Sequence, residues 1–173
     1  CIRDSSSSFN FKYLNVLKEI DKPIYFVSGN HEYYLKDYRN KINQLASFNI
    51  KHLKNTKIQI EDINLIGIDD NQTEKSKINL VNKLCDDNLF NLVVCHKPDI
   101  WQKLDCKNYL MLSGHTHNGQ IFPFNFVVKL KFKFIYGLYS MNNSNLYVSS
   151  GAACWGPKIC LLYTSDAADE VQC

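Results

Sequence analysis

Four of the five histidines in this chain lie at or just beyond the end of a short apolar run that is typical of a buried strand. In chain order, the runs at residues 24–27, 92–95 and 109–112 lead into His31, His96, and the pair His115 and His117. In open α/β sheets, ligands bind outside the carboxyl ends of the strands, so these segments can converge on one crevice. We therefore expect one site built from all of them. The fifth histidine, His52, lies in a polar stretch, and we expect it at the surface.

The residue types around these strand ends favour metal binding. Gly29 and Gly114 allow the backbone to leave the strand sharply, with φ values that other residues avoid. His115 and His117 are two positions apart, so in an extended segment they point to the same side and could each hold one of two adjacent metal ions. Imidazole with amide and carboxylate oxygens suits Mn, Fe or Zn, and the lack of nearby thiolates argues against structural zinc. Two cations about 3.5–4 Å apart can clamp the oxygens of an in-line phosphoryl displacement.

Helices and strands that would position these residues alternate along the chain. The helical patterns cover residues 11–20, 35–48 and 73–84, with a short helix after Pro98. The strand patterns cover residues 24–27, 57–60, 63–68, 92–95, 109–112 and 146–148, with the second and third of these paired as a hairpin. Asn71 and Glu74 are spaced like a capping pair for the third helix. This alternation predicts a layered α/β domain.

Three motifs occur in the order found in calcineurin-like metallophosphoesterases, each at the end of a predicted strand. They are Gly29-Asn30-His31-Glu32, the lone His96, and Gly114-His115-Thr116-His117. The flanking segments resemble a bacterial subgroup of membrane-associated or exported phosphoesterases. The resemblance implies the family's four-layer α-β-β-α sandwich, here without its first strands. It also implies hydrolysis of phosphomonoesters or phosphodiesters by a metal-bound hydroxide at a dinuclear centre of Mn, Fe or Zn.

The same resemblance assigns roles to individual residues. The metal ligands that it implies are Asn30, His96, His115 and His117, with His117 on the first metal and the other three on the second. His31 is implied to donate a hydrogen bond to the phosphate and a proton to the leaving group. Glu32 and Asp99 are implied to orient the ligand histidines.

The family's opening motifs, Asp-x-His and Gly-Asp-x-x-Asp, have no match in this chain. In the family they supply most of the first metal's ligands and the bridging carboxylate. Residues 1–4 and 160–173 resemble translated transposon adapter, and we set them aside as non-native tails. We therefore expect residues 5–159 to be a partial domain whose missing motifs lie upstream, and we expect the isolated fragment to be inactive.

Composition excludes several classes of protein. A formal net charge of +3 is too small to indicate nucleic-acid binding. Of the seven cysteines, three lie in the suspect tails, and the remaining four show no CxxC pairing, which indicates neither a zinc ribbon nor a disulfide scaffold; these four are Cys85, Cys95, Cys106 and Cys154. No apolar run is long enough to span a bilayer. The subgroup implies a membrane-associated or exported protein, and a cytoplasmic one is also compatible with the sequence.

Several alternatives stay open at this point. Lys129, Lys131 and Lys133 alternate with apolar residues, as in a solvent-facing edge strand. The same pattern fits a basic, aromatic rim that favours lipid phosphates or a membrane surface. Asp69 and Asp70 follow a strand and fit a turn better than a metal site. The rival function is a non-catalytic binding module that keeps the fold without its metals, and the retained histidines argue against it.

Overall fold

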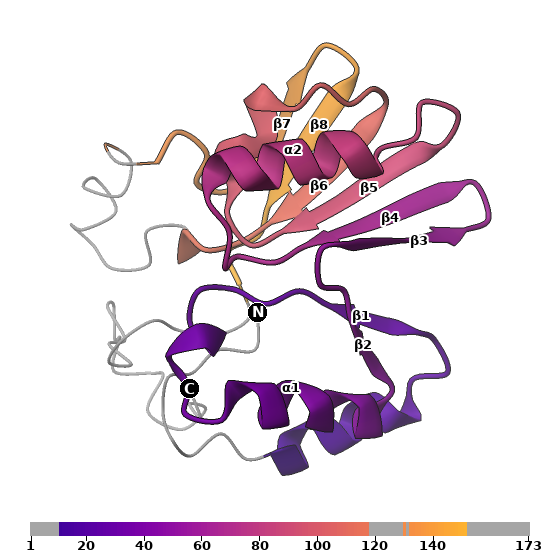
Figure 1. Cartoon of the computed structure of the whole chain (residues 1–173), viewed down its shortest axis with the longest axis vertical. Helices are drawn as coiled ribbons and strands as arrows, with labels where there is room; N and C mark the ends of the chain where they lie inside the picture. Colours follow the sequence, from indigo (N-terminus) through magenta and orange to yellow (C-terminus); the bar gives the residue numbers. More distant parts are fainter. Residues whose placement is uncertain (1–10, 118–129, 131, 152–173) are drawn as a thin grey trace, which may run out of the picture.

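The computed structural model describes residues 11–117, 130 and 132–151, which form two sheets with helices packed against them (Figure 1). The proposed domain boundaries at residues 5 and 159 and both adapter-like tails lie outside the described residues. Among the helices of the described part, none is both long and apolar enough to cross a membrane.

The larger sheet has six strands in the order β3-β4-β5-β6-β8-β7. In chain order they are β3 (Thr56–Ile60), β4 (Ile63–Ile68), β5 (Phe90–Cys95), β6 (Tyr109–Ser113), β7 (Gly137–Met141) and β8 (Ser144–Val148). The four central strands are parallel, and each edge strand forms an antiparallel hairpin with its neighbour. The carboxyl ends of β4, β5 and β6 therefore lie along one edge.

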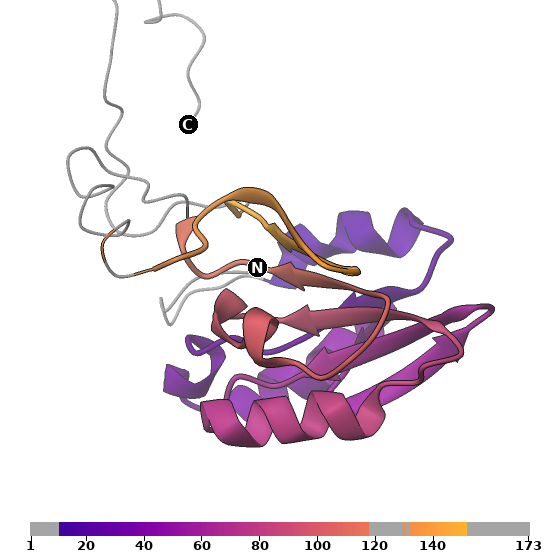
Figure 2. The ribbon, with the colours of Figure 1, turned by 90° about the horizontal axis from the view of Figure 1, so that it is seen from above.

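One face of this sheet carries the main hydrophobic core. Ile66, Val93, Met111 and Leu146 are paired across four adjacent strands and are fully buried. Helix α2 (Glu74–Leu84) and the 3-10 helix η4 (Pro98–Lys103) pack against the same core cluster. Figure 1 shows α2 lying across the sheet, and Figure 2 shows it along one face. Apolar residues at every second strand position thus explain how the sheet is covered.

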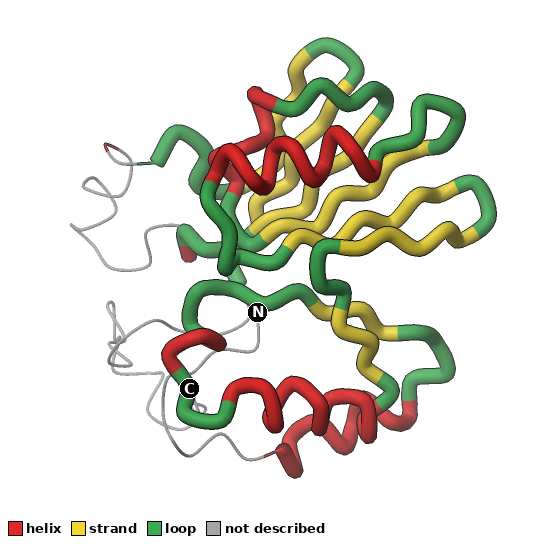
Figure 3. The backbone as a smooth tube through the Cα atoms, in the orientation of Figure 1, coloured by secondary structure: helices red, strands yellow, loops and turns green. Residues whose placement is uncertain are grey.

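The smaller sheet pairs β1 (Ile24–Phe26) with β2 (Ile50–His52) in parallel. Four helices accompany it: η1 (Phe11–Glu19), η2 (Glu32–Tyr34), α1 (Tyr38–Leu45) and η3 (Ala46–Phe48). Three of them, η1, α1 and η3, contribute residues to a second core cluster, and this part lies beside the β3–β4 side of the large sheet (Figure 3). Leu53, just after β2, lies directly against Gly67 of β4 and so connects the two parts. A Cβ added at Gly67 would lie only 2.2 Å from the Cβ of Leu53. Gly67 therefore allows β4 and the end of β2 to approach closely.

Most predicted strands and helices are confirmed, and the structure differs from the sequence-based expectation at three local points. The helix predicted at 35–48 begins at Tyr38, after Asp37 in a left-handed conformation (φ 58°). The cap of α2 is Thr73, whose Oγ1 accepts from the backbone N of Ser76 at 3.3 Å, rather than Asn71. The edge strand suggested by the alternating pattern around Lys133 does not form there, since residues 132–136 are not a strand and β7 begins only at Gly137.

The fold class agrees with the prediction at the level of a mixed α/β protein. A six-stranded mixed sheet with few helices is compatible with a metallophosphoesterase sandwich. The four-layer arrangement stays a prediction.

The structure contains a disulfide that cysteine spacing did not reveal, between Cys85 and Cys106. Cys85 directly follows α2 and Cys106 precedes β6, so the bond joins the helix to the sheet that it covers. This single bond is not a disulfide scaffold, and the cysteine spacing could not predict it because the two cysteines meet only once α2 packs on the sheet. Cys95 is a free, buried thiol in the core, and burial raises its pKa to about 11. That environment argues against the thiol as a nucleophile.

Candidate functional site

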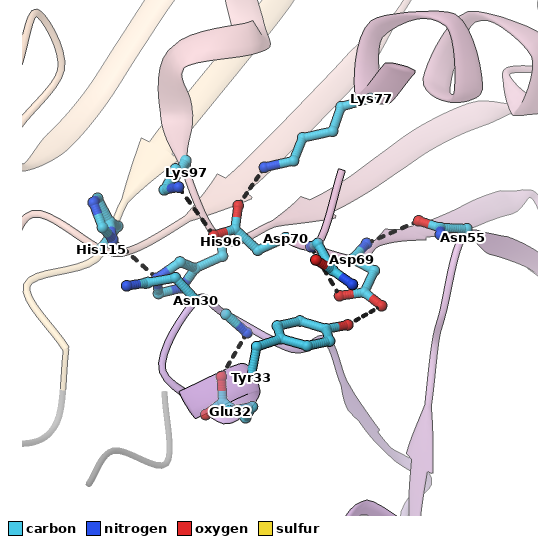
Figure 4. Close-up of polar contacts among 12 residues, drawn as sticks. Asn30, Glu32, Tyr33, Asn55, Asp69, Asp70, Lys77, His96, Lys97 and His115 are labelled. Atoms are coloured by element: carbon cyan, nitrogen blue, oxygen red, sulfur yellow. Dashed lines mark hydrogen bonds and ion pairs between the residues drawn. The ribbon is translucent and has the colours of Figure 1, made fainter. Parts of the chain in front are cut away.

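Three of the predicted ligands meet where β1, β5 and β6 end (Figure 4). The Nε2 atom of His96 lies 2.9 Å from Oδ1 of Asn30 and 3.0 Å from Nδ1 of His115. The three residues come from segments separated by 66 and 19 positions. The prediction that these strand ends converge is therefore confirmed for this trio.

The position of His96 depends on Gly29. A Cβ at residue 29 would lie 2.8 Å from Cε1 and Nδ1 of the His96 ring, closer than any side chain tolerates. Gly29 is needed for this close approach and not for a positive φ, which corrects the prediction for both Gly29 and Gly114. The backbone N of Gly29 donates to Oε2 of Glu32 at 2.7 Å. Glu32 thus holds the turn that carries Asn30.

The segment with His115 and His117 is a tight turn and not an extended chain. His115 (φ 74°) and His117 (φ 48°) both adopt left-handed conformations, and the backbone N of Thr116 donates to the carbonyl of Gly114. The prediction that an extended chain points both imidazoles to one side is therefore wrong. Non-glycine residues in this region cost about 1–3 kcal/mol each and cluster at functional sites.

Contacts on both sides hold this turn in place. The backbone N of Gly114 donates to the carbonyl of His96 at 3.0 Å, which fixes the turn to the end of β5. On the other side, the hydroxyl of Thr116 donates to the carbonyl of Ile135. The ring of Phe132 packs edge-on against His115, with centroids 5.6 Å apart. The loop before β7 therefore forms one wall of the site.

Both central histidines are neutral near pH 7. Burial, with a smaller contribution from the charge of His115, lowers the pKa of His96 to about 3. Burial and the nearby charge of Lys97 lower the pKa of His115 to about 4. Neutral imidazoles offer lone pairs to a cation, which is the form that metal binding requires.

The remaining predicted residues lie around this trio. His31 is the N-cap residue that directly precedes η2, and its Nδ1 is buried without a hydrogen-bond partner in the described part of the chain. His117 ends the turn, and its charge contributes to the lowered pKa of His115. Asp99 is exposed in the first turn of η4, and its negative charge acts to raise the pKa of His115. Their roles at a metal centre stay predictions.

Asp69 and Asp70, which fitted a turn best in the sequence, form buried polar contacts behind the site. Asp69 accepts a hydrogen bond from the hydroxyl of Tyr33, and its Oδ2 lies 3.8 Å from Nζ of Lys54. Asp70 pairs with two lysines, Lys77 of α2 and Lys97. Sequence reasoning missed both lysines, because no local pattern shows that they reach the same carboxylate.

The surface prediction for His52 was wrong. His52 ends β2, is half-buried, and places Nε2 at 2.9 Å from Oγ of the fully buried Ser28. Burial lowers its pKa. The parallel pairing of β2 with β1 turns this histidine inward, and β2 was not predicted from the sequence.

The basic, aromatic row is the segment in which Lys129, Lys131 and Lys133 alternate with apolar residues, and the structure describes only part of it. Lys129 and Lys131 lie outside the described residues, and Lys133 is exposed, with Nζ 5.5 Å from the ring centre of Phe134. Phe134 itself is buried against Trp101, with ring centroids 5.1 Å apart. The described aromatic residues of this row therefore pack inward.

The trio of Asn30, His96 and His115 fits a metal ion. Neutral imidazole nitrogens and an amide oxygen are donors that Mn, Fe and Zn accept. In neither tautomer can the Nε2 atom of His96 form full hydrogen bonds to both of its neighbours, whereas a cation would take lone pairs from all three. Within residues 11–117, 130 and 132–151, no group of three or more His, Cys, Asp or Glu could hold a metal. The donors that fit a metal ion here are therefore one amide oxygen and two imidazole nitrogens.

Comparison with curated proteins finds several metallophosphoesterases. The chain is 34% identical over 152 residues to an uncharacterized metallophosphoesterase of Campylobacter jejuni, which covers 78% of this chain and 38% of that protein. An uncharacterized metallophosphoesterase of Helicobacter pylori is 35% identical over 163 residues, covering 90% of this chain and 44% of that protein. A transmembrane protein with metallophosphoesterase domain from Bos taurus is 35% identical over 155 residues, covering 76% and 34%, respectively.

These relatives, at about one-third identity, support the metallophosphoesterase superfamily for this chain. The chain spans less than half the length of each of the three. No family model and no solved structure matches it.

Proposed function

We propose that the protein hydrolyses phosphate esters with the help of bound metal ions, as the names of its relatives suggest. The observation that supports this most is the meeting of Asn30, His96 and His115 at the ends of three strands, with both imidazoles neutral. Neutral nitrogen and amide oxygen donors at the carboxyl ends of parallel strands are suited to a cation that binds a phosphate.

In this proposal Asn30, His96 and His115 hold one divalent or trivalent ion, and His117 belongs to a second. When bound, two such ions polarise the phosphoryl group and supply a nucleophile at neutral pH. Glu32 keeps the Gly29 turn in place through its hydrogen bond, so that Asn30 stays against His96.

His31 is proposed to donate a proton to the leaving oxygen. Its Nδ1 has no hydrogen-bond partner in the described part of the chain, so this atom can bind a substrate without breaking a hydrogen bond. Its ring is T-shaped against Tyr34, with centroids 6.1 Å apart, which supports the ring from one side. General acid catalysis of this kind contributes about 10²–10⁴-fold in rate.

The test is hydrolysis of para-nitrophenyl phosphate and its bis ester by the full-length protein, with Mn²⁺ and with a chelator. We expect Mn-dependent turnover that falls about 100-fold or more in His31→Ala and is abolished in His115→Ala. Lys107→Gln is the matched control, because Lys107 is 77% exposed and pairs only with the exposed Asp87 among the described residues. No turnover of either ester, with no metal retained after dialysis, would favour a non-catalytic binding module.

We further propose that the domain works outside the reducing cytoplasm, in an exported or membrane-associated protein. The Cys85–Cys106 disulfide supports this, because such bonds form and persist in oxidising compartments. Mass spectrometry after alkylation of thiols in intact cells should recover the two cysteines linked. Their recovery as alkylated thiols would contradict the proposed compartment.

A membrane surface or a lipid phosphate is a further part of this proposal. Lys133, the described member of the basic row, is exposed beside the loop that packs on His115. Replacement of Lys129, Lys131 and Lys133 by glutamine should weaken binding to vesicles with anionic lipids. Unchanged vesicle binding would exclude the row as a membrane contact.

A further inference from the structure

Behind the histidines, a single buried carboxylate pairs with two lysines. Asp70 follows β4, and its side chain is 1% exposed. Lys77 of α2, with its side chain 4% exposed, pairs with Oδ1, and Nζ of Lys97 lies 3.1 Å from Oδ2. Figure 4 shows the two lysines reaching Asp70 from opposite sides. One negative charge thus faces two positive charges, which leaves the cluster with a surplus positive charge.

Lys97, the lysine next to His96, carries the surplus positive charge of this cluster. Lys77 lies on the buried face of α2, where an unpaired ammonium would be costly. Its pairing with Asp70 is therefore a structural necessity. Lys97 is different, because its side chain is 32% exposed and it directly follows His96. Its charge also contributes to the lowered pKa of both His96 and His115, so it acts on the centre of the site.

We propose that Lys97 binds a phosphate oxygen of the substrate, and that Asp70 and Lys77 are positioning residues that hold its ammonium beside the histidines. This inference rests on the proposed function, since it names a substrate contact of that site. Lysine is a common phosphate ligand as a point charge. Because Lys77 already neutralises Asp70, the charge of Lys97 is available to an anion.

The ammonium of Lys97 would also select between classes of substrate. A phosphomonoester carries up to two negative charges near neutral pH, whereas a phosphodiester carries one. A fixed ammonium next to the metal ligands therefore favours the monoester more strongly. If Lys97 had only a structural role, its replacement would affect the binding of the two ester classes equally.

The test uses the full-length, Mn-loaded protein and compares Lys97→Gln, Lys97→Arg and the control Lys107→Gln. Inorganic phosphate binding is measured by titration calorimetry, and KM and kcat are measured for the para-nitrophenyl mono- and diesters. Loss of one charge-assisted contact should weaken phosphate binding about tenfold in Lys97→Gln. It should also raise KM for the monoester more than for the diester. Arginine should retain most of the affinity, and Lys107→Gln should match the wild type.

The outcomes separate this inference from the proposed function. Wild-type turnover with unchanged phosphate affinity and KM in Lys97→Gln overturns the role of Lys97 alone. Phosphate binding that depends on Lys97, without turnover in the wild type, supports the contact and overturns the proposed hydrolysis. If the wild type neither binds phosphate nor hydrolyses either ester, both are overturned. Lys97→Met, which keeps the apolar length of the side chain, replaces Lys97→Gln if the latter does not fold.

Asp70→Asn tests the positioning role. It should lower phosphate affinity while Lys97 itself is intact, with a larger change in KM for the monoester than in kcat. Asp70→Glu, which keeps the charge, should recover part of the phosphate affinity lost in Asp70→Asn. If Asp70→Asn loses only thermal stability and binds phosphate as the wild type does, Asp70 has no positioning role.

Discussion

At the scale of single residues, the site depends on how closely its side chains approach one another. The His96 ring lies against the Cα of Gly29 on one side and against Asn30 and His115 on the other. Burial keeps both imidazoles neutral, so their lone pairs are available to a cation. A small displacement of His96 would therefore change all of these contacts together.

The Gly29→Ala variant should lose metal affinity by about tenfold or more, because the added Cβ would lie 2.8 Å from the His96 ring and overpacking shifts side chains at a cost of about 1–3 kcal/mol. Metal titration of the dialysed protein measures this. Gly137→Ala is the comparison, since its φ of 99° makes the change strained but a Cβ there meets nothing within 4 Å. Equal losses of metal affinity in both variants would show that the effect is general destabilisation.

At the scale of elements, α2 supplies both cover and charge to the sheet. It packs on the main core through Val81, and its Lys77 reaches the carboxylate of Asp70 at the end of β4. Its first turn is capped by Thr73. The helix therefore links the core to the ion pairs behind the site.

Acid should weaken this link. Burial raises the pKa of Asp70, but the hydrogen bonds and charges of Lys77 and Lys97 outweigh it, so the pKa lies below its ordinary value of 3.8. The group therefore contributes stability above its unfolded-state pKa, and the contribution is lost as the pH falls through the folded-state pKa. Urea unfolding between about pH 6 and pH 2 should show a steeper acid loss for the wild type than for Asp70→Asn. Parallel pH profiles for the two proteins would contradict this assignment.

The N-cap offers a second prediction for α2. Thr73→Ala should lower the unfolding free energy by about 1 kcal/mol, because the Ser76 backbone N loses its acceptor. Asn71→Ala should change it by less than about 0.5 kcal/mol, as is usual for an exposed position without a cap role. Urea unfolding of both variants decides between them. The reverse order would restore the capping pair expected from the sequence.

At the scale of the whole molecule, the Cys85–Cys106 disulfide ties the end of α2 to the start of β6. The two cysteines are 21 residues apart, and their chain segment includes β5 and η4, which precede or carry site residues. The bond thus closes a loop around the segment with His96 and Lys97.

Reduction of this disulfide should lower the unfolding free energy by about 3 kcal/mol, the magnitude expected for closing a loop of this size in the unfolded chain. Urea unfolding with and without a thiol reductant measures the change. The double variant Cys85→Ser and Cys106→Ser should have the unfolding free energy of the reduced wild type, and the reductant should not change it. A reductant effect that persists in this variant would have to come from another cysteine.

Local periodicity made most strands and the short helix after Pro98 predictable, because alternating apolar residues and punctuating prolines act over a few positions. β2 was missed because it has only three residues, Ile50–His52, and is recognised by its pairing with β1. The meeting of Asn30, His96 and His115 could be predicted from their common place at strand ends.

The ends of the strands and the donor atoms that follow them could be read from the chain alone, since both are local properties. Three contacts could not: the close approach of the His96 ring to Gly29, the pairing of Asp70 with Lys77 and Lys97, and the bond between Cys85 and Cys106. These contacts join residues that are distant in the chain. Their existence depends on how α2 and the two sheets pack, and no short pattern of residues encodes that packing.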